Sequence, residues 1–155
     1  MPTGFEATSA HVISAAAAAK EGGATLAELK SWGFVTAYEA DFDRDATLSH
    51  ALTGAIEIDS ITSVFRTKKG AEKSVARSEA VCHKPQAQEL SVGAEIGDET
   101  HVCSFVKRSS GYTFQIYGVV WRRGNLKGAV IVVGIKGVSP DQAVSLARVQ
   151  DKRMR

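Results

Sequence analysis

Residues 111–134 read GYTFQIYGVVWRRGNLKGAVIVVG, two runs of apolar and β-branched residues around a two-residue turn. Val, Ile, Tyr, Phe and Trp favour strands, and Gly124-Asn125 is a typical hairpin turn. The second run is apolar at nearly every position, which is typical of a central strand that is covered on both faces. This stretch therefore predicts an antiparallel hairpin at the centre of a sheet.

Three more strands are expected around this hairpin. The stretch GFVTAYEADFD, residues 33–43, alternates aromatic with acidic side chains, and GAIEIDSITSVFR, residues 54–66, is rich in β-branched residues. Alternation with a period of two and β-branched composition both indicate strands. A third strand at about 99–107 precedes the hairpin and is joined to it by RSSG.

Three helix starts are visible between and after these strands. Thr25 with Glu28, and Ser139 with Gln142, have the spacing of a capping box, in which each side chain bonds the other residue's backbone N–H. A third helix is expected to start at Thr67. The element order is thus α-β-β-α-β-β-β-α, which predicts an α+β fold: one antiparallel curved sheet of about five strands with helices packed on one face.

Composition limits the partner classes. The chain has 155 residues, enough to bury a core without metals or cross-links, and its formal net charge of +2 does not indicate nucleic acid as a partner. No apolar run approaches the length of a transmembrane segment. The stretch HVISAAAAAKEGG resembles the apolar core of a signal peptide but has no Lys or Arg before it. We expect an N-terminal arm or short helix over residues 1–23 and a single α+β domain over residues 24–155.

The two cysteines, Cys82 and Cys103, lie in the stretches VCHK and THVC, each close to a histidine. Together with His83 and His101 they suggest zinc ligands. However, adjacent Cys82 and His83 point in different directions, whereas structural zinc sites usually have two or more residues between paired ligands. We therefore expect no metal and no cofactor. A disulfide, which an extracytoplasmic location would favour, and two buried free thiols both remain open.

One face of the predicted strand 112–123 is the candidate binding surface. Alternation places Gln115, Tyr117, Trp121 and Arg123 on the same side, and aromatic side chains with polar tips beside Gln and Arg are typical of ligand or protein contacts. His101 is added as a nearby polar candidate. The alternative is that an N-terminal segment covers this face, with Arg123 lying over Trp121.

No motif for nucleophilic serine chemistry, phosphate binding or dinucleotide binding is present. A set of acidic residues alternates along the expected strands 33–43 and 54–66. A solvated sheet face is a better interpretation of this set than a calcium site. These residues are Glu39, Asp41, Asp43, Glu57 and Asp59. An enzyme of the cystatin-like or NTF2-like kind would have His101, Asp59 and Glu57 available, and a closed pocket holding one of them with a perturbed pKa would favour that class.

Several stretches together resemble small bacterial exported or lipoprotein-type domains, common in actinobacteria: LKSWGFVTAYEADF, SVFRTKKGAE, AEIGDET, VVWRRGNLKGAVIVVG and LARVQDKRM. The resemblance covers residues 26–154 and rests on turns and caps. It implies an antiparallel sheet with helices, similar to PsbP and Mog1 proteins or to mycobacterial extracellular sensor domains, and it implies no enzyme.

The leading hypothesis is accordingly a non-catalytic binding or sensor domain for an unknown small molecule or protein. An extracytoplasmic location is favoured over a cytoplasmic one. The two alternatives are the pocket-forming enzyme and a structural domain whose binding face is buried in a homodimer.

Overall fold

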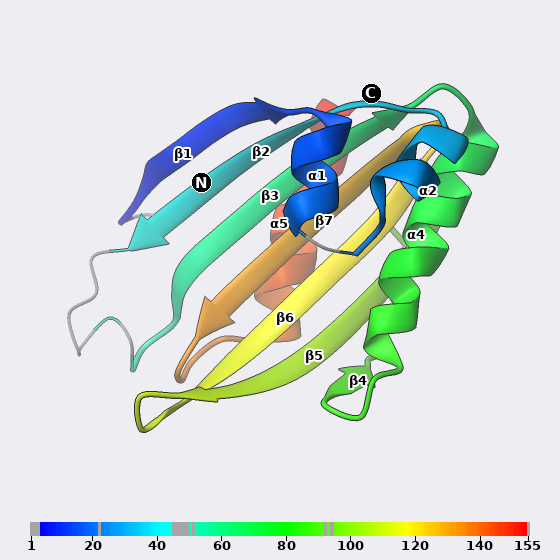
Figure 1. The fold of residues 1–155 in the computed structure, drawn as a ribbon. Coiled ribbons are helices and arrows are strands. Elements are labelled where there is room, and N and C mark those ends of the chain that lie inside the picture. Colours follow the sequence, from blue (N-terminus) through cyan, green and yellow to red (C-terminus); the bar gives the residue numbers. More distant parts are fainter. Residues whose placement is uncertain are drawn as a thin grey trace.

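An antiparallel sheet runs through the whole molecule and separates two layers of helices (Figure 1). The computed structural model describes residues 4–21, 23–44, 50, 52–91, 93 and 95–154. Within these residues the sheet has seven strands, in the order β1-β2-β3-β7-β6-β5-β4. The strands are β1 (Phe5–Ile13), β2 (Phe34–Arg44), β3 (Ala55–Phe65), β4 (Ala87–Glu89), β5 (Glu99–Ser109), β6 (Tyr112–Arg123) and β7 (Leu126–Gly134).

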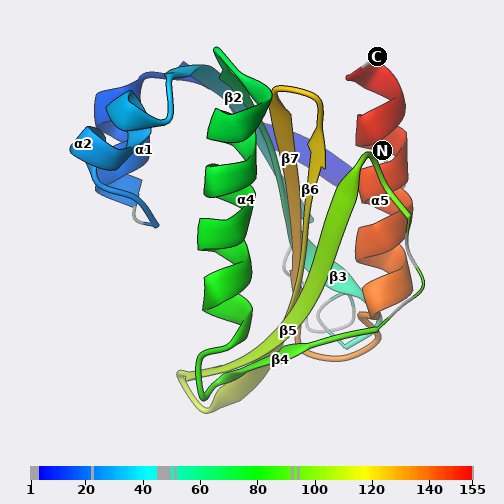
Figure 2. The same cartoon turned by 90° about the vertical axis from the view of Figure 1, so that its right-hand side faces the viewer.

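The helices lie on both faces of this sheet, so the expectation of helices on one face is wrong. They are α1 (Ala15–Glu21), α2 (Leu26–Ser31), α4 (Lys68–Cys82) and α5 (Pro140–Arg153). Figure 2 shows α1, α2 and α4 on one side of the sheet and α5 on the other. The reason is visible in β7, whose side chains are apolar on both faces and need a cover on each.

Local signals place the helix starts and the central turn. Thr25 and Ser139 each form the predicted capping box, and the Thr67 hydroxyl accepts a hydrogen bond from the Gly70 N–H. The β6–β7 hairpin turns at Gly124 and Asn125, with Arg123 paired to Leu126. These predictions are confirmed, because each depends only on residues close together in the chain.

The strand count differs from the prediction of about five because two strands were not expected. Residues Phe5–Ile13, expected as an arm or short helix, pair with β2 along an edge of the sheet, and only Ile13 among them is buried. The opposite edge is the short strand Ala87–Glu89. The helix predicted near the N-terminus begins only at Ala15.

The main hydrophobic core lies between the sheet and α5. Three helix residues, Ala143, Val144 and Ala147, pack with buried side chains of β3, β5, β6 and β7. Small residues at these helix positions allow the helix to approach the sheet closely. None of the described helices is long and apolar enough to cross a bilayer.

Candidate ligand-binding cleft

The face of β6 that the sequence indicated as a binding surface lies under α5. Trp121 has no solvent exposure and belongs to the core beneath the helix. Arg123 donates two hydrogen bonds to Asp151 of α5, from Nε to Oδ1 at 2.6 Å and from Nη2 to Oδ2 at 2.5 Å. The cover is therefore the C-terminal helix and not an N-terminal segment, and Trp121 is not accessible to a ligand in this structure.

The other two residues of that face lie further along β6. Tyr117 is half-buried against the core, and its hydroxyl donates to Gln115 Oε1 at 3.1 Å. Gln115 itself is exposed. A binding role for Gln115 and Tyr117 stays a prediction.

A cleft opens on the opposite face of the sheet, between α4 and the α1–α2 pair. Its volume is about 410 Å³. Strands β2, β3 and β7 form its floor, with Asp59, Ile61 and Ala129 among the floor residues. The walls are largely apolar and include Leu29 from α2 and Val81 from α4. A concave site with apolar walls and a few polar groups is typical of small-ligand sites.

Acidic residues from two neighbouring strands gather at one end of this cleft. Asp41 of β2 lies directly opposite Asp59 of β3, and Asp43 lies opposite Glu57 in the next pair along the same face. Glu39, two residues before Asp41 on β2, lines the cleft together with Asp59. Directly opposed residues have Cβ atoms only about 4.5–5.5 Å apart, and like charges in such pairs are destabilising.

The electrostatics reflect this crowding. Burial, together with the charges of Glu57, Asp41, Glu39 and Asp43, raises the pKa of Asp59 to about 7. Burial, and then the carboxylate of Glu21, also raises the pKa of Glu39. Every charge that acts on Asp59 is thus negative. A cation placed here would relieve the repulsion and favour the ionised carboxylates.

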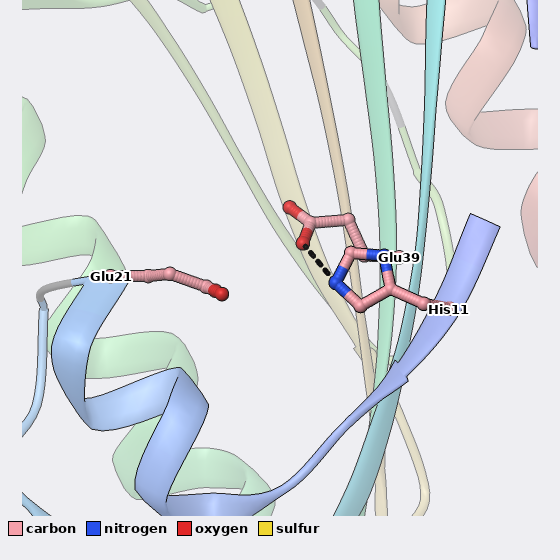
Figure 3. Close-up of side chains that lie close together, drawn as sticks. All are labelled: His11, Glu21 and Glu39. Carbon is pink, nitrogen blue, oxygen red and sulfur yellow. Dashed lines mark ion pairs between the residues drawn. The ribbon is translucent and has the colours of Figure 1, made fainter. Parts of the chain in front are cut away.

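The rim of the cleft carries one histidine. His11 Nε2 lies 3.8 Å from Glu39 Oε2, and the Glu21 carboxylate points toward this pair from the end of α1 (Figure 3). Both Glu21 and Glu39 line the cleft. The charge of His11 acts against the rise in the pKa of Glu39 that burial and the neighbouring carboxylates cause.

The other end of the cleft floor holds a lysine. Lys127 of β7 lies opposite Ser63 of β3 and donates from Nζ to Ser78 Oγ of α4 at 2.7 Å. Burial lowers the pKa of Lys127 to about 8. The cleft therefore has carboxylates at Asp59 and Glu39 and, separated from them by apolar side chains, a cation at Lys127. Arg77 on the α4 wall is a further cation, and its Nε donates to the Gly23 carbonyl.

The residues named for an enzyme are only partly brought together. Asp59 lies in the cleft with a raised pKa, as that class requires, but the cleft is open and Glu57 is exposed beside it. His101 lies on β5, separated from β3 by β7 and β6. The hydrogen bonds among the described residues include none to the Asp59 carboxylate.

Cys82 at the end of α4 and Cys103 of β5 form a disulfide with their Cα atoms 5.5 Å apart. The two cysteines are buried, and their bond ties α4 to the sheet beside the cleft. Their sulfurs are therefore not available as zinc ligands.

A second hollow lies on the other face, between α5 and strands β2 and β3. Its volume is about 600 Å³, and Tyr38, Phe42 and Leu146 are among the residues that line it. Its lining is mostly apolar and lacks the clustered carboxylates of the cleft.

Comparisons with known proteins bear on the fold alone. No protein-family model matches the chain, and no curated protein matches it in sequence. Among solved structures, the chain is similar to the extracellular domain of PknH from Mycobacterium tuberculosis, with a TM-score of 0.58. That match covers 97% of this chain and 86% of the PknH domain at 8% sequence identity. The expected likeness to mycobacterial extracellular sensor domains is thus supported at the level of fold, whereas the likeness to PsbP and Mog1 proteins stays a prediction.

Proposed function

We propose that this chain is a non-catalytic, extracytoplasmic binding or sensor-type domain that takes a small cationic ligand in the cleft between α4 and the α1–α2 pair. The observation that carries the proposal is the half-buried Asp59 carboxylate, on which only negative charges act. An ammonium or guanidinium group there gains charge-assisted hydrogen bonds and removes the repulsion.

The shape of the cleft supports a ligand with an apolar body as well as a charge. Ile61 and Ala129 form the floor between the acidic end and Lys127, and Leu29 lines the cleft from α2. Burying an apolar group against such walls contributes roughly 25 cal/mol per Å². The charged group would then set orientation, and the apolar body would supply much of the affinity.

Two further observations favour an extracytoplasmic setting. Disulfides such as Cys82–Cys103 persist mainly in oxidising compartments. The structurally similar PknH domain is an extracellular one, and the fold is therefore compatible with that environment.

The test is a titration followed by NMR with two probes of matched shape, 2-phenylethylamine and the uncharged 2-phenylethanol. We expect the amine to shift backbone amides around Glu39 and Asp59, and the alcohol to bind at least tenfold more weakly. Asp59→Asn should weaken amine binding roughly tenfold, as expected for the loss of one hydrogen bond to a charged group. Glu95→Gln, which removes an exposed carboxylate outside the cleft, is the matched control and should bind like the wild type.

Equal binding of both probes, or shifts confined to the α5 face around Gln115 and Tyr117, would contradict the cationic-ligand assignment. The second outcome would instead favour the surface that the sequence indicated.

A further inference from the structure

A second group of ionisable side chains converges beside the disulfide, and its members are not among the residues that line the cleft. Glu79 comes from α4, Glu89 from β4 and His101 from β5. His101 Nδ1 lies 3.4 Å from Glu89 Oε1 and 3.7 Å from Glu79 Oε1, and the three ligand atoms all lie within 4.8 Å of one another. We propose that this group binds a divalent transition metal of the zinc class.

The separations of His101 Nδ1 from the two carboxylates are compatible with a shared metal ion. In a tetrahedral zinc site with bonds of about 2.0–2.2 Å, neighbouring ligand atoms lie about 3.4 Å apart. The His101–Glu89 and His101–Glu79 edges of this triangle are therefore close to the edges of such a tetrahedron.

The hydrogen-bonding capacity of the imidazole leads to the same conclusion. Nδ1 has either one proton or one lone pair, so it can satisfy at most one of the two carboxylates that face it. Glu79 and Glu89 both point an oxygen at this single nitrogen. A metal ion between the three atoms would bond all of them at once.

The other ring nitrogen of His101 has the partner that a metal-binding histidine needs. His101 Nε2 lies 3.4 Å from Glu99 Oε1, and the second oxygen of Glu99 accepts from Arg122 Nε at 3.3 Å. Arg122 is buried and is held in turn by Asp98 through Nη1 at 2.6 Å. A carboxylate on one ring nitrogen fixes the tautomer and leaves the other nitrogen's lone pair for the metal. Glu99 is thus a positioning residue for His101.

The framework around the group is rigid. Glu89 pairs with Cys103 across β4 and β5, and the Cys82–Cys103 disulfide fixes the end of α4 to the same strand. The three chain elements that supply the ligands are therefore tied together next to the site. The fourth position of the tetrahedron is open to water or to His83, whose Nε2 lies 3.7 Å from Glu79 Oε1.

The donor set selects the metal class. One imidazole nitrogen with two carboxylates suits zinc and the neighbouring transition metals, whereas calcium and magnesium prefer oxygen ligands alone. This assignment rests on residues outside the cleft and does not depend on the proposed cationic ligand. It also revises the expectation of no metal: the two histidines remain candidates after the cysteines are removed as ligands.

Isothermal titration of the oxidised full chain with zinc chloride, in buffer that contains excess calcium, tests the proposal. We expect one zinc ion per chain, loss of binding in His101→Ala, and at least tenfold weaker binding in Glu89→Gln. Glu99→Gln should retain the site but bind roughly tenfold to a hundredfold more weakly. The matched control is His11→Ala, which removes the histidine of the other His–carboxylate group and should leave the zinc affinity unchanged.

Cobalt(II) absorption gives a second readout, since tetrahedral coordination has an intense visible spectrum that octahedral coordination lacks. Circular dichroism of each variant verifies that it is folded. The proposal is overturned if the wild type takes up no zinc, if Glu89→Gln and His101→Ala bind zinc like the wild type, or if His11→Ala abolishes binding.

Discussion

Asp41 and Asp59 face each other directly across strands β2 and β3, so two carboxylates occupy one cross-strand pair beside the cleft. Such a pair costs stability when both groups are ionised. Asp41 is one of the charges that raise the pKa of Asp59, the group on which the proposed function rests.

The first prediction concerns pH. The pKa of Asp59 is raised to about 7 from an ordinary value of 3.8, so between these values the folded chain binds a proton that the unfolded chain has released. Stability associated with Asp59 is thus fully present below about pH 4 and is lost as the pH rises through 7. Allowing for solvent screening of this partly exposed group, the loss at pH 8 is about 1–2 kcal/mol.

Asp59→Asn should remove that loss and be more stable than the wild type at pH 8, with little difference at pH 4. Urea unfolding at pH 4, 6 and 8 measures it, with Glu95→Gln as the control that keeps the wild-type pH profile. Equal pH profiles for Asp59→Asn and the wild type would show that Asp59 ionises normally.

The second prediction concerns the disulfide. Cys82 and Cys103 are 21 residues apart, and closing a loop of that size contributes about 3 kcal/mol in the chain-entropy model. A Cys82→Ala, Cys103→Ala double variant should lose about that much stability, and reductant should lower the stability of the wild type but not of the variant. Intact mass before and after reduction, with a thiol-blocking reagent, verifies the bond: the oxidised chain is two hydrogens lighter and has no thiol to label. Free thiols in protein from its native host would contradict the bond and weaken the extracytoplasmic assignment.

How far the sequence could predict this molecule depends on how local each feature is. The capping box at Ser139 and the turn at Gly124 depend on neighbouring residues, and both lie where they were predicted. The edge strand Phe5–Ile13 has few buried side chains, so apolar and polar residues alternate only weakly along it. Its extended structure depends on its pairing with β2, which the local sequence does not show. Both faces of β7 are apolar, so the pattern in this strand does not predict which face α5 covers.

The candidate site is less predictable for the same reason. Alternation showed that Asp41 and Asp59 each lie on a strand face with other acidic residues. It could not show that they form a direct pair, because register depends on how the two strands align. The His101 group is further removed from the local pattern, since its members come from a helix and two strands. The binding face at Trp121 was a reasonable expectation from one strand, because the helix that covers it, α5, follows only after β7 in the chain and its docking is a tertiary contact.

The third prediction concerns the ion pair that fastens α5 over β6. Asp151 is buried, and Arg123 binds both of its carboxylate oxygens. Breaking a buried pair by removing one partner costs about 3–5 kcal/mol, at the lower end here because Arg123 keeps partial solvent access. Asp151→Ala should therefore cost about 3 kcal/mol. A double-mutant cycle with Arg123→Ala should give a coupling energy of about 1–3 kcal/mol. Additive losses in urea unfolding would mean that the two side chains act independently.

The fourth prediction concerns the close approach of Gly128 to Trp121, which lie opposite each other on β7 and β6. A Cβ atom at Gly128 would overlap the buried indole ring, which has no room to move because Trp121 is completely enclosed by the core. Gly128→Ala should therefore destabilise the protein by about 3 kcal/mol, the upper end of the usual cost of overpacking.

Gly118 provides the matched control on β6. A Cβ there would meet Phe105 Cε2 at 3.8 Å, an ordinary contact, so Gly118→Ala should be neutral or slightly stabilising through the unfolded chain. Thermal unfolding of the two variants separates steric overlap from a general intolerance of alanine in these strands. If both variants lose the same stability, the cost arises from the strands themselves; if Gly128→Ala is neutral, the indole is free to shift and the core beneath α5 is looser than its burial indicates.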